Sequence, residues 1–406
     1  MKYIDGGVCA AKGFKAAGVF CGVKANSSPS KKDLALIYSE IPCAAAGIFT
    51  KNQVKAAPVL LDMELIKDGV AQAIVANSKN ANACAPDGME NAKRMCQAAA
   101  NALNIPAENV MVSSTGVIGQ RLNIEAIEKG IPMAVEQLSY DGSDAAANAI
   151  MTTDTVKKEF ACELEIGGKL IHIGGIAKGS GMIHPNMGTM LCYITTDCAI
   201  SAAMLKKALL DANKLSFNRI SVDGDTSTND SCIVLANGLA GNAEITAEGT
   251  DYDAFFEAFL AICTALARSM AADGEGAKHL ITCVVKGAAS VNQAETIGKS
   301  VIGSALTKSA IFGCDANWGR VLAAMGYSGE TFDPEKVNVS FASTAGSILV
   351  CKDGRGVDFD EELATKILSE SEVIIDILMA EGSCEATCWG CDLTYDYVRI
   401  NGDYRT

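Results

Sequence analysis

The sequence predicts a mixed α/β fold in which mixed β-sheets pack against helices. The chain has 406 residues, 49% of them hydrophobic, which is enough to bury a substantial core and to form more than one structural unit. Apolar residues recur at helical spacing in some segments and form short strand-like runs in others. The two kinds of segment alternate without a strict βαβ rhythm, and no long linker or clear internal repeat separates them. A mixed sheet is therefore favoured over a purely parallel one.

In the first half of the chain, short apolar runs separated by turns predict hairpins up to about residue 60. These runs are GVFCGVKA, DLALIYSE and AAAGIFTK. The other predicted elements of this half are strands at 73–76 and 109–113, helices at 87–103 and 123–138, and a hairpin at 159–176 that turns at Gly167 and Gly168. The strand at 109–113 leads into a loop of small and hydroxyl residues, SSTGVIG, so that this loop lies at a strand end.

The alternation is more regular after residue 189. The predicted elements are strands at 190–196, 219–222, 280–286, near 337–341 and 347–351, helices at 201–213, 251–272, 291–307 and 361–369, a loop at 313–319, and a strand-rich C-terminal end. The helix at 251–272 is the longest. Its apolar residues at helical spacing predict a core helix; they are Phe255, Phe259, Ile262, Leu266 and Met270.

Charge and hydropathy exclude several classes of protein. Lys and Arg number 34 against 48 Asp and Glu, a net charge of −14, and no basic block stands out, which disfavours nucleic-acid or anionic-membrane binding. No apolar run approaches the roughly 18–20 residues of a transmembrane helix. The start, MKYIDGGVCAAKGF, lacks the apolar core of a signal peptide. We therefore expect a soluble, cytoplasmic protein.

Cysteine is abundant, with 16 residues. In a long cytosolic chain these are expected to be reduced and mostly buried thiols. One cluster comprises Cys384, Cys388 and Cys391, and the last two form a C-x-x-C pair. A zinc site needs further ligands, but the chain has only three histidines and none has paired-ligand spacing with these cysteines. We expect no metal site here.

The most informative stretch is 177–197, AKGSGMIHPNMGTMLCYITTD. Its glycine-rich loop reaches Thr189 and then becomes an apolar strand. A hydroxyl next to Gly188 suits a threonine that attacks the preceding carbonyl and is released by water as a new N-terminus. Its α-amine, with a pKa of about 7.7–8.0, would then act as the base for its own hydroxyl. On the pattern alone, an inert glycine-rich turn feeding a buried strand is the favoured alternative.

Longer segments, from KGFKAAGVFCGVK (12–24) through KGSGMIHPNMGTML (178–191) to WGCDLTYDYVRINGDYRT (389–406), resemble those of a known family. This is the ornithine acetyltransferase (glutamate N-acetyltransferase) family of arginine biosynthesis, often called ArgJ. The resemblance covers nearly the whole chain in the family's order. It is carried by KGFKAAGVFCGVK (12–24), AAAGIFTKNQVKAAPV (44–59), SSTGVIGQ (113–120), MTTDT (151–155), KGSGMIHPNMGTML (178–191), SVDGDTSTNDS (221–231), GEGAKHLI (274–281), KSAIFGCDANWGRVLAA (308–324) and WGCDLTYDYVRINGDYRT (389–406).

The resemblance implies a self-cleaving N-terminal-nucleophile architecture of the kind shared by ArgJ and DmpA. The precursor is expected to cut itself between Gly188 and Thr189 into an α chain, 1–188, and a β chain, 189–406, which assemble as an α2β2 heterotetramer. Thr189 would accept the acetyl group of N-acetyl-ornithine and pass it to glutamate in a ping-pong scheme, without a metal or bound organic cofactor. Acetyl-CoA is a second candidate donor, on which the sequence does not decide.

The resemblance also assigns site residues. Thr115 and Gly116, in the loop after strand 109–113, match the oxyanion hole, where a hydroxyl and a backbone N–H would stabilise the tetrahedral intermediate. A substrate that is an amino acid needs a fixed cation and a fixed anion, and Lys178 and Glu275 suit these roles. The residues that match the family's substrate contacts are Thr152 (with Thr153 as an alternative), Lys178, Thr189, Glu275, Asn401 and Thr406.

The chain departs from the family pattern at two positions. Residue 188 is Gly where Ala is usual, which adds backbone freedom at the predicted cleavage site. Gly402 follows Asn401 where Ala is common. The segment before this tail, WGCDLTYDYVRI, is predicted to be extended and to anchor the last residues.

Two other functions stay open at this stage. A related self-cleaving architecture serves aminopeptidases, in which water replaces glutamate as the acceptor. A non-catalytic α/β binding protein would keep the Gly188-Thr189 bond intact. The acidic VDGDTSTND segment does not have the spacing of a calcium loop and is interpreted as a structural turn network.

Overall fold

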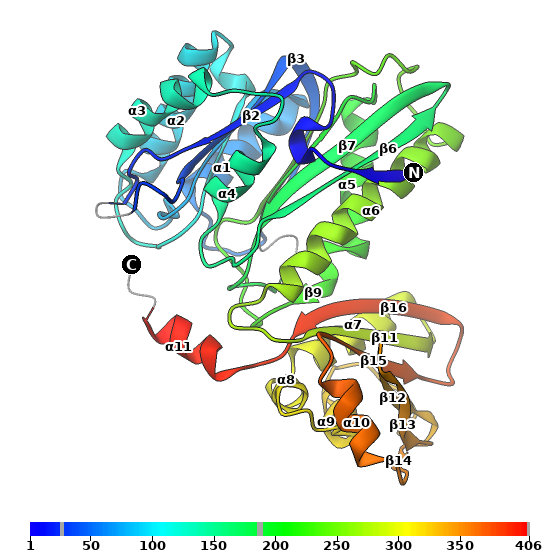
Figure 1. Ribbon diagram of the computed structural model, residues 1–406. Coiled ribbons are helices and arrows are strands. Elements are labelled where there is room, and N and C mark those ends of the chain that lie inside the picture. The colour runs from blue at the N-terminus through cyan, green and yellow to red at the C-terminus, as the bar shows by residue number, and fades with distance from the viewer. Residues whose placement is uncertain (25–27, 185–189, 404–406) are drawn as a thin grey trace. The chain divides into compact units, whose positions relative to one another are not determined.

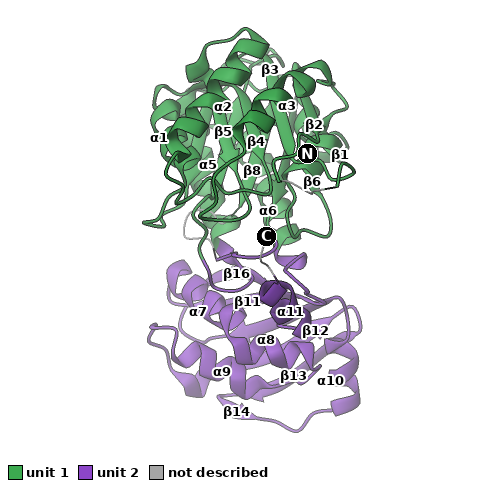
Figure 2. Cartoon of the chain, turned by 90° about the vertical axis from the view of Figure 1, so that its left-hand side faces the viewer, with its two compact units in different colours: residues 1–179, 185–218, 226–270 green, residues 180–184, 219–225, 271–406 purple. Residues whose placement is uncertain are grey.

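The computed structural model describes residues 1–24, 28–184 and 190–403. The chain divides into two compact units, each built around one β-sheet (Figures 1 and 2). Unit 1 comprises residues 1–179, 185–218 and 226–270, and unit 2 comprises residues 180–184, 219–225 and 271–406. Both units combine mixed sheets with helices, so the predicted mixed α/β class is confirmed.

The sheet of unit 1 contains nine strands among the described residues, in the order β1-β6-β7-β8-β10-β3-β4-β5, with β2 paired to β3. They are β1 (Lys2–Ile4), β2 (Phe14–Val19), β3 (Leu34–Phe49), β4 (Val70–Asn77), β5 (Val110–Ser114), β6 (Lys158–Ile166), β7 (Lys169–Lys178), β8 (Leu191–Thr196) and β10 (Ser231–Ala236). The pairs β4–β5 and β8–β10 are parallel, and β7–β8 and β3–β10 are antiparallel.

Helices cover both faces of this sheet. The helical elements of unit 1 are α1 (Ala57–Leu65), α2 (Gly88–Leu103), α3 (Ile124–Glu136), α4 (Ser143–Ile150), α5 (Ala202–Leu215) and α6 (Thr250–Ala272, which continues into unit 2), with short 3-10 turns η1 (Gly7–Cys9), η2 (Ile66–Asp68), η3 (Ala107–Asn109) and η4 (Phe217–Arg219, whose last residue belongs to unit 2). Successive residues of β3 point to opposite faces. Leu36 packs in the core with Met95 of α2, whereas Ile37 packs in the core with Ala146 of α4.

Helix α6 is long and apolar enough to cross a membrane by length and composition alone. The five apolar residues predicted to face the core are each fully buried. The helix passes close to β7, where a Cβ added to Gly175 would lie 3.0 Å from Leu266 Cδ1. Figure 1 shows α6 running along the β6–β7 part of the sheet. This is the packing of a core helix, as predicted.

The sheet of unit 2 contains seven strands among the residues described, in the order β14-β13-β12-β15-β11-β16-β9. Its strands are β9 (Ile220–Ser221), β11 (Leu280–Ala288), β12 (Asn338–Ser343), β13 (Gly346–Lys352), β14 (Arg355–Gly356), β15 (Glu372–Leu378) and β16 (Cys384–Cys391). Its helices are α7 (Val291–Gly303), α8 (Ala305–Phe312), α9 (Trp318–Gly326), α10 (Glu361–Leu368) and α11 (Tyr395–Asp403), with the 3-10 turn η5 (Pro334–Lys336). Cys388 lies in this core, and burial raises the pKa of its thiol to about 12.

Two predicted features of the backbone are wrong. The runs DLALIYSE and AAAGIFTK are not separate strands of a hairpin but one bent strand, β3, whose register shifts between Tyr38 and Cys43. Pro42 lies in this interruption, where no ladder hydrogen bond is required of it. The C-terminal lead-in is extended only to Cys391, and the chain then forms α11. The hydroxyl of Thr394 accepts the Tyr397 N–H at 3.3 Å at the start of that helix.

Local capping explains further differences from the prediction. The predicted helix at 291–307 is divided at Ser304, whose hydroxyl accepts the Thr307 N–H at 3.3 Å and starts α8. The predicted loop at 313–319 ends early because Asn317 caps α9 by accepting the Arg320 N–H at 3.2 Å. Helices α1 and α4 were not predicted. Helix α1 has no side-chain cap and begins with Pro58 in its first turn, so its signal in the sequence is weak.

Candidate functional site

The predicted site residues fall into three sets. Gly188, Thr189 and Thr406 lie outside the described residues. Unit 1 holds Thr115, Gly116, Thr152 and Lys178, and unit 2 holds Glu275 and Asn401. Each unit brings its own residues together, as the contacts below show.

The loop that carries Thr115 is fixed by two buried asparagines. The parallel strands β4 and β5 end together, and there the Asn77 carbonyl accepts the Thr115 N–H at 3.0 Å. The Ser114 hydroxyl donates to Asn77 Oδ1 at 2.6 Å. From the segment before β10, Asn229 Nδ2 donates to the Ser114 carbonyl at 2.8 Å. Asn77 was not predicted as a site residue; its position at the end of a buried strand is the feature of the sequence that could have indicated it.

Gly116 has a conformation and surroundings that require glycine. Its φ is +133°, and a Cβ would lie 2.3 Å from the carbonyl carbon of Lys79 and 2.5 Å from the Asn80 nitrogen. Among the described residues, its backbone N–H has no hydrogen-bond acceptor. Thr115 is 9% exposed. An unpaired N–H beside a nearly buried hydroxyl is the arrangement that an oxyanion hole needs.

Lys178 lies at the end of β7, opposite Leu191, the first residue of β8. Its side chain reaches the same loop, because Nζ lies 3.4 Å from Thr115 Oγ1. Lys178 is only 8% exposed. A nearly buried ammonium group with one long hydrogen bond is suited to receive a carboxylate.

Asp154, which was not predicted as a site residue, links two residues that were, Thr152 and Lys178. Its side chain is fully buried, and it accepts from Lys158 Nζ at 2.7 Å, the Gly179 N–H at 2.8 Å and the Thr152 N–H at 3.1 Å. Burial alone would raise the pKa of this carboxyl. The positive charges of Lys178 and Lys158, with the hydrogen bonds, outweigh it and lower the pKa to about 2. Asp154 therefore stays ionised and fixes the segment of Thr152 next to the end of β7.

In unit 2, Glu275 and Asn401 are in direct contact. Asn401 Nδ2 donates to Glu275 Oε2 at 2.7 Å and to the Tyr397 carbonyl at 3.0 Å. Glu275 is 7% exposed, and within the described residues its Oε1 has no hydrogen-bond partner. A Cβ on Gly181 would lie within 2.5 Å of this carboxylate, so glycine is required there. The free oxygen can accept an ammonium group.

Asp223 holds the segment that passes this carboxylate. It accepts the N–H groups of Met182 at 2.6 Å and Ile183 at 2.9 Å, and the Tyr397 hydroxyl at 3.3 Å. Burial, followed by the negative charge of Asp223, raises the pKa of Tyr397. These are contacts of a structural turn, which agrees with the interpretation of VDGDTSTND.

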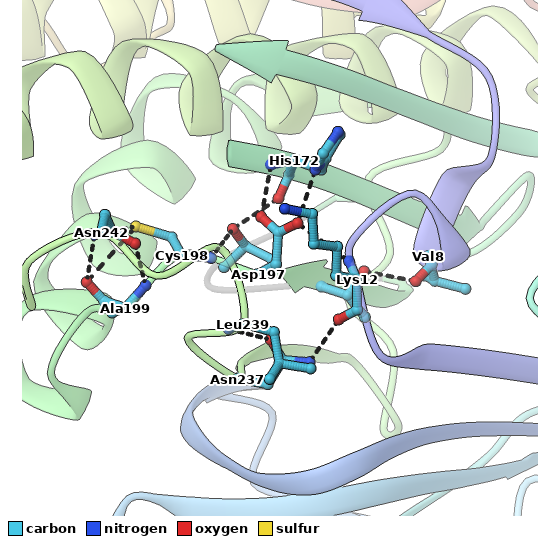
Figure 3. Close-up of polar contacts among 11 residues, drawn as sticks. Val8, Lys12, His172, Asp197, Cys198, Ala199, Asn237, Leu239 and Asn242 are labelled. Carbon is cyan, nitrogen blue, oxygen red and sulfur yellow. Dashed lines mark hydrogen bonds and ion pairs between the residues drawn. The ribbon is translucent and has the colours of Figure 1, made fainter. Parts of the chain in front are cut away.

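A second polar cluster lies at the other end of β7 and β8, and both carboxylate oxygens of its Asp197 have hydrogen-bond partners (Figure 3). His172 Nδ1 and Asp197 Oδ2 lie 2.7 Å apart, and Asp197 also accepts the N–H groups of His172 at 2.7 Å and Lys12 at 3.1 Å. The neighbouring thiol of Cys198 is not activated, because burial raises its pKa to about 12. This cluster fastens the segment after η1 to the sheet.

Comparisons with known proteins give one consistent result. A sequence model of the ArgJ family matches residues 15–406. The arginine biosynthesis bifunctional protein ArgJ of Symbiobacterium thermophilum is 52% identical over 407 residues, and its counterpart in Caldanaerobacter subterraneus subsp. tengcongensis is 51% identical over 408; both alignments cover 100% of each chain. A crystal structure of the arginine biosynthesis bifunctional protein argJ from Bacillus halodurans is 44% identical, with a TM-score of 0.49, and covers 51% of this chain and 96% of that one.

Proposed function

Because this chain belongs to the ArgJ family, we propose that it is a self-cleaving acetyltransferase of arginine biosynthesis, which moves the acetyl group of N-acetyl-ornithine to glutamate. The observation that carries this proposal is the full-length similarity, at 52% identity, to a relative named for arginine biosynthesis. The aminopeptidase alternative is not favoured, since the relatives at this level of identity share the biosynthetic name.

The first step of the proposal is cleavage between Gly188 and Thr189. The Thr189 hydroxyl attacks the Gly188 carbonyl, and the resulting ester is hydrolysed to a free carboxylate and an N-terminal threonine. The sheet of unit 1 would hold the two fragments together afterwards. Strands β7 and β8 pair residue by residue from Ile173–Thr196 to Lys178–Leu191, and β3 pairs with β10. Each of these pairs has one strand on either side of the cleaved bond.

The second step is acetyl transfer through a threonine ester. The Thr189 hydroxyl attacks the acetyl carbonyl of N-acetyl-ornithine while its own amine takes the proton, and the ornithine amine leaves. The Gly116 N–H and the Thr115 hydroxyl stabilise the oxyanion, which fits the lack of an acceptor for that N–H among the residues that the structure describes. Glutamate then attacks the ester through its amine, giving N-acetylglutamate and free Thr189.

Substrate recognition in this proposal uses one cation and one anion. Lys178 receives a carboxylate, and Glu275, held by Asn401, receives the ammonium group of ornithine. Thr152 and Thr406 complete the contacts carried over from the family. The scheme requires no metal and no bound organic cofactor. It also includes an α2β2 assembly in the cytoplasm.

The test is denaturing mass spectrometry of freshly purified protein, followed by an assay of labelled N-acetyl-ornithine with glutamate. We expect two fragments, the second beginning at Thr189, and label in N-acetylglutamate rather than in acetate. The Thr189→Ala variant should remain one chain and lose transfer by about 10⁴-fold or more. A wild-type chain that stays intact at 42.2 kDa without activity, or normal transfer by Thr189→Ala, would contradict the proposal.

A further inference from the structure

Unit 1 contains a pocket of about 480 Å³, and none of the predicted site residues that the structure describes lines it. Its volume lies within the ~300–1,000 Å³ range of small-molecule sites. The pocket lies between the second half of β3, the segment that joins α1 to β4, and the first turns of α5. Most of the side chains that line it are apolar, including Phe49, Met63 and Ile66. One half-buried lysine, Lys206, also faces it.

The pocket forms where β3 extends beyond the neighbouring strand β4. The pairing of β4 with β3 ends at Ala44, whereas β3 continues along β10 to Phe49. Past Ala44, this edge of β3 has no neighbouring strand among the described residues. There the carbonyl of Gly47 accepts a hydrogen bond from the ammonium group of Lys206. A side chain of α5 thus occupies part of the place that another strand would take.

Lys206 brings a positive charge into these apolar surroundings. An ammonium group has three donors. Among the residues that the structure describes, that of Lys206 has the Gly47 carbonyl as its one acceptor and has no acidic partner. Burial lowers the pKa of Lys206. A bound carboxylate would accept the remaining donors and oppose this effect of burial, because an opposite charge favours the protonated form.

The other charged residues of the pocket do not compensate Lys206. Lys67 forms an ion pair with Glu64, and Asp68 accepts the Val70 N–H at 2.9 Å through its Oδ1. Both Lys67 and Asp68 are exposed, so that solvent and salt screen their charges. The half-buried charge of the pocket is therefore positive and favours an anion.

The apolar lining lies next to this charge. A Cβ on Gly47 would lie 2.8 Å from Cζ of Phe49 and 3.7 Å from Cγ1 of Ile66. The absence of a side chain at Gly47 thus lets the Phe49 ring lie against the strand, beside the carbonyl that binds Lys206. A carboxylate bound to Lys206 would have these apolar groups within reach of its own tail, and their burial against it would be favourable.

The strand that borders the pocket also leads to the predicted oxyanion loop. Thr50, the residue after β3, donates its N–H to the Asp230 carbonyl at 3.0 Å and its hydroxyl to the Ser227 carbonyl at 2.8 Å. The same segment contains Asn229, which holds the Ser114 carbonyl at 2.8 Å. A ligand that shifts the end of β3 would therefore act on the backbone that positions the oxyanion loop.

We propose that this pocket is a regulatory site for a small carboxylate with an apolar tail, bound by the ammonium group of Lys206 and the ring of Phe49. The regulatory role rests on the acetyltransferase function proposed above. Neither substrate of that reaction suits the pocket. The side chain of N-acetyl-ornithine ends in an ammonium group and that of glutamate in a second carboxylate, and burying either charge against apolar walls is costly.

The test uses hexanoate as the probe. Hexanol and hexylamine serve as matched probes, with the same chain but without the charge or with the opposite charge. Lys206→Met keeps an unbranched side chain and removes the positive charge. Lys214→Met is the control, since this exposed lysine near the end of the same helix lies outside the pocket. Calorimetric titration measures binding, analytical ultracentrifugation measures assembly, and steady-state kinetics gives kcat for acetyl transfer.

Hexanoate should bind to wild type and to Lys214→Met equally, and to Lys206→Met at least about tenfold more weakly, as for a lost hydrogen bond between charged groups. Hexanol and hexylamine should also bind to wild type at least about tenfold more weakly than hexanoate. Saturating hexanoate should change the kcat of wild type by about fivefold or more and leave that of Lys206→Met unchanged. N-acetyl-ornithine should not displace hexanoate.

Four results would each overturn the proposed site: no binding of hexanoate to wild type, equal binding to Lys206→Met, equal binding of hexanol, or displacement of hexanoate by N-acetyl-ornithine. A changed oligomeric state of Lys206→Met in place of weaker binding would overturn it as well, because the pocket would then be a contact between subunits. Binding without a change in kcat would overturn the regulatory role. If wild type transfers no acetyl group at all, the proposed function fails, whereas the titrations still test the site because they do not depend on turnover.

Discussion

The two ends of the β7–β8 pair differ in how completely their polar groups are bonded. At the end marked by Lys178, the ammonium group has one hydrogen bond of 3.4 Å, and the nearby N–H of Gly116 has no acceptor in the described part of the chain. At the other end, Asp197 accepts from the backbone and ring of His172 and from Lys12 at 2.7–3.1 Å. Both ends are buried or nearly so, and both carry charge.

Within one pair of strands, the hydrogen-bonded groups at one end stabilise the structure, and the incompletely bonded groups at the other end are suited to bind a ligand. A buried polar group without a partner costs free energy, and a ligand or a reacting atom that supplies the missing bond recovers that cost. The Asp197 end has its bonds already and needs no ligand. The Lys178 end is incomplete in the way that a binding site must be.

The largest expected effect comes from filling the space beside the unpaired N–H. Gly116→Ala would place a Cβ 2.3 Å from the Lys79 backbone and displace the loop. Loss of one oxyanion donor reduces kcat by about 10²–10³-fold. The matched control is Gly119→Ala in the same loop, which also has positive φ, +82°, but has no atom within 4 Å of the added Cβ. Equal losses of kcat in the two folded variants would show that backbone strain, rather than the donor, is responsible.

The second largest effect is expected at Lys178, whose ammonium group has one long hydrogen bond. Lys178→Met keeps an unbranched side chain at the end of β7 but removes the charge, and KM for N-acetyl-ornithine should rise by about 10–100-fold, as for a lost hydrogen bond to a charged group. Lys169→Met, at the exposed start of the same strand, serves as the control. Steady-state kinetics on both variants checks this. If Lys178→Met left KM unchanged, Lys178 would not be the carboxylate-binding residue.

The fold could be predicted from the sequence where the local pattern agrees with the tertiary structure. The core face of α6 is an example, because its apolar residues at helical spacing are all buried. The continuity of β3 was not predictable, because Pro42 between two apolar runs also fits a hairpin turn. Pairing with β4 and β10 along its length makes the two runs one strand. Similarly, the C-terminal aromatic residues have strand propensity, but α11 begins at Tyr395 after the capping hydroxyl of Thr394.

The candidate site could be predicted only in part, and for a physical reason. Resemblance selected Thr115, Gly116 and Lys178, and unit 1 brings Thr115 and Lys178 into contact. Asp154 was missed. Its importance comes from its burial and from the charges and N–H groups around it, which the fold brings together from separate segments.

At the Asp197 end of the β7–β8 pair, a substitution should lower stability and leave substrate binding unchanged, which is the reverse of the effect expected at Lys178. Asp197→Asn puts an NH₂ group where a carboxylate oxygen accepts hydrogen bonds, leaving at least one donor unpaired at a cost of about 1–3 kcal/mol. The melting temperature should fall, while KM for both substrates stays at the wild-type value. Calorimetry and kinetics on the same sample decide this. A changed KM with unchanged melting temperature would mean that this end also belongs to the site.

The smallest effect concerns acid stability at the Lys178 end. The folded pKa of Asp154, about 2, lies below the ordinary aspartate value of 3.8, so its ionised form stabilises the fold above pH 4. This contribution is lost as the pH falls from about 4 to about 2, and amounts to about 2 kcal/mol. Asp154→Asn lacks the titrating group, so between pH 5 and pH 2 its free energy of unfolding should fall less than that of wild type. Urea unfolding across this range tests the difference, with the exposed Asp141→Asn as control. If Asp154→Asn kept the full wild-type slope, the acid sensitivity would have to arise elsewhere, and the charge network that joins Thr152 to Lys178 would not depend on this carboxylate.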